Sequence, residues 1–199
     1  MRPFSVYVEF DTADASPDTY EALHDALADQ HGAVGPSPNG NISVRLTVNA
    51  DSVIEATTLG IEHAQAAALP HGITPDTVIG TEVITEAERD RRVLEEDEYD
   101  ESSTVDERQG RDSQPAFIVY VEFDRADGSL NQYEALHCAL AEQRGAVGPA
   151  SNGNLSCRLT VEADSVVQAV ALGIEYAQAA AITCDISPDA VIGTEVERG

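Results

Sequence analysis

The feature that most constrains the fold is an internal repeat. Residues 5–83 align with residues 118–196 without a gap, at a constant offset of 113, and 54 of the 79 pairs are identical. Each copy of about 80 residues is long enough to bury a modest core of its own. The sequence therefore predicts a first repeat over 1–84, a second over 117–199, and a connecting segment over 85–116.

Within one copy, the hydrophobic pattern changes from alternating to helical and back. Phe4, Val6, Val8 and Phe10 alternate with polar residues, which indicates a half-buried strand. Ser16-Pro17 and Ser52-x-x-Glu55 are typical helix starts, and Asn39-Gly40 between them is a hairpin turn signal. A last strand is expected over 78–84. The order strand, helix, strand, strand, helix, strand predicts an α+β, ferredoxin-like unit, whose antiparallel sheet carries both helices on one face.

The opposite face of each sheet is expected to carry the same polar side chains in both copies. These residues are Tyr7, Glu9, Arg45 and Thr47, with their counterparts Tyr120, Glu122, Arg158 and Thr160. They could bind a small anion or carbonyl through Arg45. The favoured interpretation is a cross-strand Glu9–Arg45 ion pair on a face that packs against the other copy. The copies can pack face to face or side by side as one wider sheet, and the repeat favours a pseudo-twofold arrangement in either case.

The segment between the repeats is rich in charge. Thr85-x-x-Glu88 resembles a capping box, so a short helix is expected to run to about Asp97. Residues 98–114 show no apolar periodicity and are predicted to form a flexible acidic linker.

The net charge narrows the classes of partner. The chain has 36 acidic residues, 11 arginines and no lysine, for a net charge of −25. Such a chain repels phosphates, so direct nucleic-acid binding is not expected. A high-GC genome or a salt-adapted surface would explain the acidity, and so would a basic protein partner. Sequence signals for a membrane span or a signal peptide are lacking, which predicts a cytoplasmic protein with no membrane association.

Few residues are candidates for catalysis or metal binding. The three cysteines form no C-x-x-C pair, and no metal or cofactor motif is present, so we expect neither. His24 and His137 could act as general bases beside Glu21 and Glu134, although a polar helix boundary is the favoured interpretation. His63 and His71 are replaced in the second copy, which argues against a repeated metal site.

A line of carboxylates is expected along the first helix. These residues are Asp18, Glu21, Asp25 and Asp29, at helical spacing opposite the buried stripe. They suggest a docking face for a basic protein, or a mimic of the phosphate spacing of DNA. The alternative, which is favoured, is a solvated helix face.

Three segments resemble a family of small acidic proteins of actinobacteria and their phages. They are residues 6–10, 39–48 and 85–92, and together they cover each repeat and the start of the connecting segment. The resemblance implies a ferredoxin-like domain that stands alone or precedes a helix-turn-helix segment. Here a second copy stands in the place of that segment. The resemblance implies no catalytic residues.

These observations favour a non-enzymatic function. The prediction is an acidic protein-interaction or regulatory module, an inhibitor or adaptor of phage-related type, that acts as an internal pseudo-dimer. The alternative is a small-molecule sensor or enzyme with a pocket between two sheets, lined by Tyr7, Arg45, Tyr120 and Arg158. A structural subunit of a larger assembly is a third hypothesis.

Overall fold

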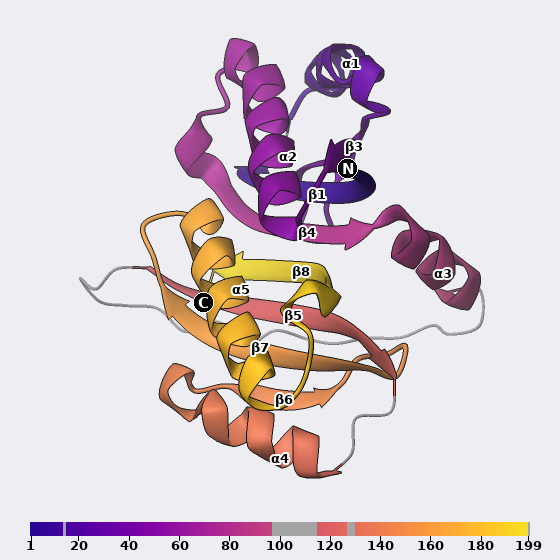
Figure 1. Cartoon of the computed structure of the whole chain (residues 1–199). Coiled ribbons are helices and arrows are strands. Elements are labelled where there is room, and N and C mark those ends of the chain that lie inside the picture. The colour runs from indigo at the N-terminus through magenta and orange to yellow at the C-terminus, as the bar shows by residue number, and fades with distance from the viewer. Residues whose placement is uncertain (14, 97–114, 127–129, 199) are drawn as a thin grey trace.

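A computed structural model describes residues 1–13, 15–96, 115–126 and 130–198 (Figure 1). It is an α+β structure in which eight strands form one antiparallel sheet, in the order β2-β3-β1-β4-β8-β5-β7-β6. The strands of the first repeat are β1 (Arg2–Ala13), β2 (Ala33–Pro36), β3 (Asn41–Ala50) and β4 (Val78–Thr85). Those of the second are β5 (Ala116–Ala126), β6 (Ala146–Pro149), β7 (Asn154–Glu162) and β8 (Val191–Arg198).

Helices alternate with these strands in the predicted order. They are α1 (Pro17–Ala26), α2 (Val53–Ala68), α3 (Glu86–Glu96), α4 (Leu130–Ala139) and α5 (Val166–Thr183). The expected serine caps are present: Ser52 Oγ accepts a hydrogen bond from the backbone N–H of Glu55, and Ser165 Oγ accepts one from Gln168, each at 3.2 Å. A cap of this kind stabilises a helix by about 1 kcal/mol.

The two repeats lie side by side. Strands β4 and β8 pair through Gly80–Glu197, Glu82–Glu195 and Ile84–Gly193. Glu82 and Glu195 are counterparts at the offset of 113, so a pseudo-twofold axis passes between them. The sequence left the packing open, and the structure places both repeats in one wider sheet. The predicted pocket between two facing sheets therefore has no counterpart.

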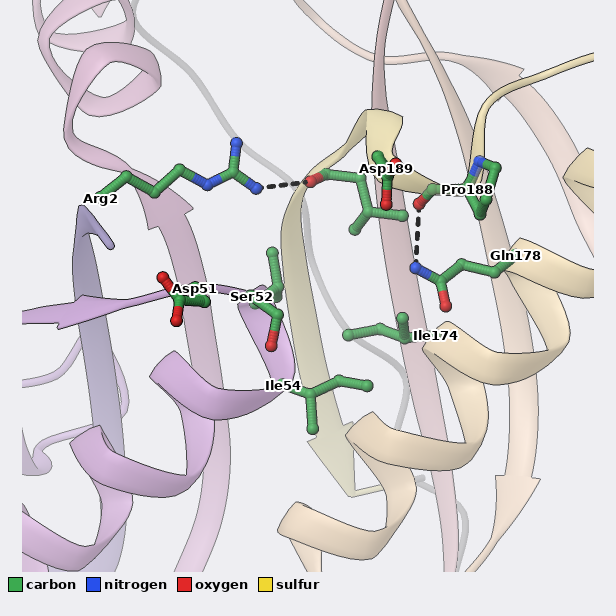
Figure 2. Close-up of a pocket in the computed structure, with 10 residues that line it drawn as sticks. Arg2, Asp51, Ser52, Ile54, Ile174, Gln178, Pro188 and Asp189 are labelled. Carbon is green, nitrogen blue, oxygen red and sulfur yellow. Dashed lines mark hydrogen bonds between the residues drawn. The ribbon is translucent and has the colours of Figure 1, made fainter.

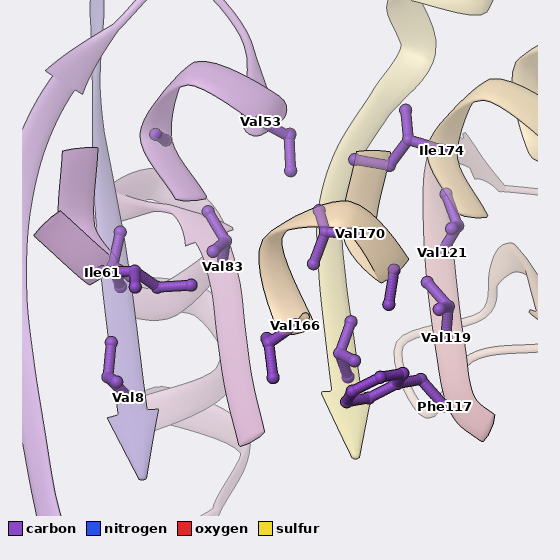
Figure 3. Close-up of a cluster of buried hydrophobic side chains, with 14 of the residues drawn as sticks. Val8, Val53, Ile61, Val83, Phe117, Val119, Val121, Val166, Val170 and Ile174 are labelled. Atoms are coloured by element: carbon purple, nitrogen blue, oxygen red, sulfur yellow. The ribbon is translucent and has the colours of Figure 1, made fainter. Parts of the chain in front are cut away.

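One apolar core runs beneath the helices of both repeats (Figure 3). Val53 and Ile61 of α2 belong to the same buried cluster as Val166, Val170 and Ile174 of α5. Burial of one such side chain contributes about 1.5–3 kcal/mol. Because the cluster is continuous across the β4–β8 pairing, each repeat shares its core with the other.

Two glycines let the long helices lie close to the sheet. A Cβ at Gly60 of α2 would lie 2.4 Å from Cγ1 of Val6, and one at Gly173 of α5 would lie 2.4 Å from Cγ1 of Val119. Close approach of backbone to strand therefore requires glycine at both positions. The small-residue helices expected from the sequence have this packing role.

Helix α5 passes the length and composition test for a membrane span, with 18 residues and a mean hydropathy of 1.3. In the structure its apolar side packs on the sheet, with Val166, Val170 and Ile174 among its buried residues. A core helix that covers a sheet has the same composition, so the hydropathy of α5 follows from its place in the core.

Candidate functional site

Helix α3 lies on the sheet face opposite the other helices. Thr85 Oγ1 caps it by accepting from the backbone N–H of Glu88 at 3.2 Å. Thr47 of β3 then donates to Glu86 Oε1 at 2.9 Å. Thr47 points away from the buried side chains of its strand, so this bond places α3 on the face that α2 and α5 leave open, called here the open face. The sequence suggests a helix in this segment, but it does not indicate where the helix lies.

Arg92 of α3 joins the two repeats. Its guanidinium donates to Glu82 Oε1 at 3.0 Å, to Glu122 Oε2 at 2.7 Å, and to Glu88 Oε1 at 2.9 Å. Glu82 belongs to the first repeat and Glu122 to the second, and the Glu122 side chain is 1% exposed. Charge-assisted bonds of this kind are about twice as strong as neutral ones. Arg92 is therefore the centre of an ion cluster that spans the pairing of β4 with β8.

The charges in this cluster shift one another's pKa values. Burial of the Arg92 guanidinium opposes its charge, but the carboxylates of Glu88, Glu122 and Glu82 outweigh that effect and raise its pKa. Burial likewise opposes the charge of Glu88, whereas hydrogen bonds from Arg91, Arg92 and Asn152 lower its pKa overall. The shifts of Arg92 and Glu88 both favour the ionised form.

The β6–β7 hairpin completes the cluster. Asn154 Nδ2 donates to Glu122 Oε1 at 2.8 Å, and Asn152 donates to the same oxygen. Asn152 also donates to Glu88 Oε1 at 2.9 Å. The Asn-Gly-Asn turn that the sequence uses as a hairpin signal therefore orients Glu122 toward Arg92.

A row of polar residues crosses the middle of the open face. In strand order it reads Arg45, Tyr7, Glu82, Glu195, Tyr120 and Arg158, with each residue directly opposite the next. Arg45 pairs with Glu82 at 2.8 Å and lies over the ring of Tyr7 at 5.2 Å. Although Glu195 is exposed as a residue, partial desolvation of its carboxyl group, with the charges of Glu82 and Glu197, raises its pKa. The two halves of the row have the same residues but different ion pairs: Arg45 pairs with Glu82, whereas the described residues show no such pair between Arg158 and Glu195.

The structure brings the predicted sheet-face residues together on the open face, with two corrections. The expected Glu9–Arg45 ion pair is not formed, because Arg45 turns toward Glu82. Glu9 instead accepts from Ser37 Oγ at 2.8 Å and from Asn41 Nδ2 at 3.0 Å. The face is not packed against a second sheet either, since the repeats meet edge to edge.

The hollow on the open face is too small for a substrate. Its volume is about 20 Å³, and Glu82, Arg92, Tyr120, Glu122 and Glu195 are among its lining residues. A volume of this size holds about one water molecule. Among the described residues, Tyr7, Arg45, Tyr120 and Arg158 lie in one row of a single sheet and do not surround a pocket between two sheets.

Two larger pockets lie on the helix face, where the start of one long helix meets the end of the other. The first has a volume of about 270 Å³, and Arg2, Asp51, Ser52, Ile174 and Gln178 are among its lining residues (Figure 2). The second, of about 130 Å³, is lined by the counterparts of the last four, Asp164, Ser165, Ile61 and Gln65. In each pocket the glutamine donates to a proline carbonyl, Gln178 to Pro188 at 2.9 Å and Gln65 to Pro75 at 3.1 Å. The repeat therefore builds two related pockets.

The predicted acidic line is exposed. Asp18, Glu21 and Asp25 lie on α1, while Asp29 lies in the following 3-10 turn, Ala28–Gln30. Within the described residues, none of the four carboxylates has an ion pair with a base. His24 and His137, with Glu21 and Glu134, are also exposed on their helices, outside either pocket.

The cysteines lie apart from these features. Cys157 and Cys184 are buried, and Cys138 is exposed. Burial raises the pKa of the Cys157 thiol to about 12. In the part of the chain that the structure describes, no group of three or more His, Cys, Asp or Glu side chains is placed to hold a metal ion.

Sequence reasoning missed the residues that organise the open face. Arg92 stands in a segment interpreted as the start of a linker, and Asn152 and Asn154 were assigned only a turn role. A signal was available in the arginines that follow the Thr85 cap, since Arg89 and Arg92 share one helix face at a spacing of three.

Comparison with protein-family models and with curated proteins found no match. Among solved structures, the chain is similar to the small subunit of acetolactate synthase from Thermotoga maritima. The two share 11% identity over 100% of this chain and 94% of that one, with a TM-score of 0.29. A likeness at this level carries no conclusion, so the function is argued from the geometry above.

Proposed function

We propose that this chain is a non-enzymatic, acidic regulatory module: two ferredoxin-like repeats fused as an internal pseudo-dimer that binds a basic protein partner. The observation that carries the proposal is the exposed line Asp18, Glu21, Asp25 and Asp29, whose carboxylates are unpaired within the described residues. On the open face, in contrast, Arg45 and Arg92 form ion pairs with Glu82 and Glu122. The α1 side therefore keeps its field available for a partner.

The test is a binding comparison between three forms of the full chain. The first is unchanged, and the second carries Asp18→Asn, Glu21→Gln, Asp25→Asn and Asp29→Asn. The third is a matched control in which four exposed carboxylates of the second repeat are neutralised, Glu134, Glu142, Glu162 and Glu175, each to Gln. Each form is immobilised and exposed to host lysate at low and moderate salt.

A protein retained in stoichiometric amount by the unchanged chain and the control, lost with the α1 variant and lost as salt rises, supports the proposal. Because screening removes attraction between exposed charges, the salt response is part of the expected result. Retention of the same protein by all three forms at every salt concentration would reject docking through the α1 line.

A second candidate function is a small-molecule sensor, which the two related pockets on the helix face favour. Both are bounded by elements of both repeats, so a ligand there would stabilise the pairing of the repeats. A ligand that binds the folded form raises the melting temperature. A compound screen by thermal shift would identify such a ligand, and Ile54→Trp, at a partly buried residue that lines the larger pocket, should abolish its effect if the site is correct.

A further inference from the structure

We propose that the open face of the first repeat is a docking site for an arginine-bearing helix of a partner protein. The site corresponds to the one that α3 fills on the second repeat. The inference goes beyond the acidic line of α1, because it would stand even if that line bound nothing. The same set of residues occurs once in each repeat. The copy in the second repeat is occupied by α3, and the copy in the first repeat is open.

The occupied copy shows what the site binds. Glu122 Oε1 accepts from the amides of Asn152 and Asn154, and this leaves Oε2 to bind the guanidinium of Arg92 at 2.7 Å. The second carboxylate for the same guanidinium is Glu82, from the neighbouring repeat. The arrangement is a carboxylate held by two amides and aimed at an arginine from a helix.

The open copy has the same carboxylate in the same orientation. Glu9 Oε1 accepts from Ser37 and Asn41, the latter being the counterpart of Asn154. Its other oxygen, Oε2, has no hydrogen bond or ion pair among the described residues. Asn39, the counterpart of Asn152, is exposed. Glu195, the counterpart of Glu82, is also exposed, and its charge has no ion-pair partner in the part of the chain that is described.

The pseudo-twofold relationship gives the position that a helix over the open copy would take. Helix α3 follows β4 and reaches the second repeat because β4 pairs with β8. A helix covering Glu9 would by the same symmetry follow β8. None of the helices among the described residues takes that position.

Among the described residues, the spacing of the sheet rows leaves room for a second helix beside α3. Helix α3 crosses the row that contains Ile84 and Gly193, and the symmetric path crosses the row that contains Gly80 and Glu197. The two rows are four residues apart along β4, or about 13 Å at the rise of a strand. Packed helices need about 8–10 Å between their axes.

Two differences between the copies indicate the chemistry of the partner. The sheet surface beneath α3 includes Ile84, which is 3% exposed. In the open copy, the residue at the equivalent position is Glu197. The position of Ala150 is taken by Ser37, which holds Glu9. The open copy is therefore more polar and more acidic than the filled one. It fits a helix with an arginine, whose fork can bridge Glu9 and Glu195 as Arg92 bridges Glu122 and Glu82, and with polar rather than apolar neighbours.

The test uses a peptide as probe and the full chain as receptor. The peptide is residues 85–96, acetylated and amidated, with Asp90→Asn, Glu95→Gln and Glu96→Gln to remove repulsion. Binding is followed by fluorescence anisotropy at low salt. We expect saturable binding that falls at least about tenfold for a chain carrying Glu9→Gln and for a peptide carrying Arg92→Gln. Glutamine at position 9 keeps the acceptor for Ser37 and Asn41 but replaces the oxygen that would accept from arginine.

The controls separate this site from the other proposals. The chain with the neutralised α1 line should bind the peptide like the unchanged chain after correction for net charge, as should Glu142→Gln. Unchanged melting curves confirm that each variant is folded. Absence of saturable binding, or binding that Glu9→Gln leaves unaltered, would overturn the proposal. Self-association of the chain that Glu9→Gln abolishes would also overturn it, because the occupant would then be a second copy.

Discussion

Glu82 on β4 and Glu195 on β8 lie directly opposite each other at the pairing of the two repeats, although both are acidic. Like charges opposite each other in a sheet are destabilising. Arg92 offsets this at Glu82 with a 3.0 Å ion pair, and Arg45 adds a second at 2.8 Å. Arg92 of helix α3 therefore reduces the repulsion between the two carboxylates where the repeats pair. The first two predictions follow from this relationship.

Arg92→Ala should destabilise the fold strongly, because it leaves the buried Glu122 without its guanidinium partner and removes one of the two guanidinium groups that bind Glu88. Loss of one partner from a buried ion pair costs about 3–5 kcal/mol, and since Arg92 is 28% exposed we expect about 2–4 kcal/mol. The free energy of unfolding in urea measures it. Arg89→Ala, which removes a more exposed pair with Glu86, is the control and should change stability by less than about 1 kcal/mol. Equal effects of the two changes would contradict the central role of Arg92.

Glu195→Gln should stabilise the fold at neutral pH. The folded-state pKa of Glu195 is raised, so ionisation of this group disfavours the folded state. The contribution of Glu195 to the free energy of unfolding is greatest below the pKa of this group in the unfolded state. It declines as the pH rises through the pKa of the group in the folded state. Glu195→Gln removes this pH-dependent loss of stability. Because the side chain is partly exposed, we expect the free energy of unfolding at neutral pH to rise by about 1 kcal/mol or less.

The pH dependence of this gain is its check. Unfolding free energies of the unchanged chain and of Glu195→Gln should converge near pH 3, where the carboxyl group is protonated in both states, and separate by pH 7. Glu175→Gln, an exposed change on α5 with the same charge difference, serves as control. A gain of equal size for Glu175→Gln would show that net charge, and not the opposition of Glu82 and Glu195, is responsible.

Gly60→Ala should be destabilising even though alanine is the better helix former. The new Cβ would lie 2.4 Å from Val6 Cγ1, so helix α2 must shift from the sheet. Overpacking of this kind costs about 1–3 kcal/mol, more than the roughly 1 kcal/mol gained in helix propensity. Thermal unfolding measures the difference, and Val6→Ala in the same chain should recover part of it. Gly148→Ala, where a Cβ meets no atom within 4 Å, should have little effect.

The three thiols should differ widely in reactivity. The Cys157 pKa of about 12 leaves about one part in ten thousand as thiolate at pH 8, and the thiolate is the reactive form. Titration of the native chain with a chromogenic disulfide should therefore detect one fast thiol, Cys138, and three thiols after unfolding. Cys138→Ser should abolish the fast phase. A fast phase that persists in this variant would show that a buried thiol becomes accessible in the native state.

Much of the local structure could be read from the sequence. The repeat, the helices begun by Ser16 and Ser52, the Asn39-Gly40 turn and the division of each strand into a buried and a polar side all follow from short-range chemistry. The alternation of Val6 and Val8 with Tyr7 and Glu9 was enough to assign the open face, because side chains of a strand alternate between the two faces of a sheet.

The relative placement of the repeats and of α3 was decided by tertiary structure alone. The alternation of buried and polar side chains assigns the two faces of each strand, but it does not show which edge or face of one repeat meets the other. Arg45 shows a similar limit within one repeat: the sequence suggested Glu9 as its partner, but the pairing of β4 with β1 brings Glu82 to 2.8 Å from Arg45. The ion cluster of Arg92, Glu82 and Glu122 joins residues from a helix and two repeats, so it exists only after the whole sheet has formed.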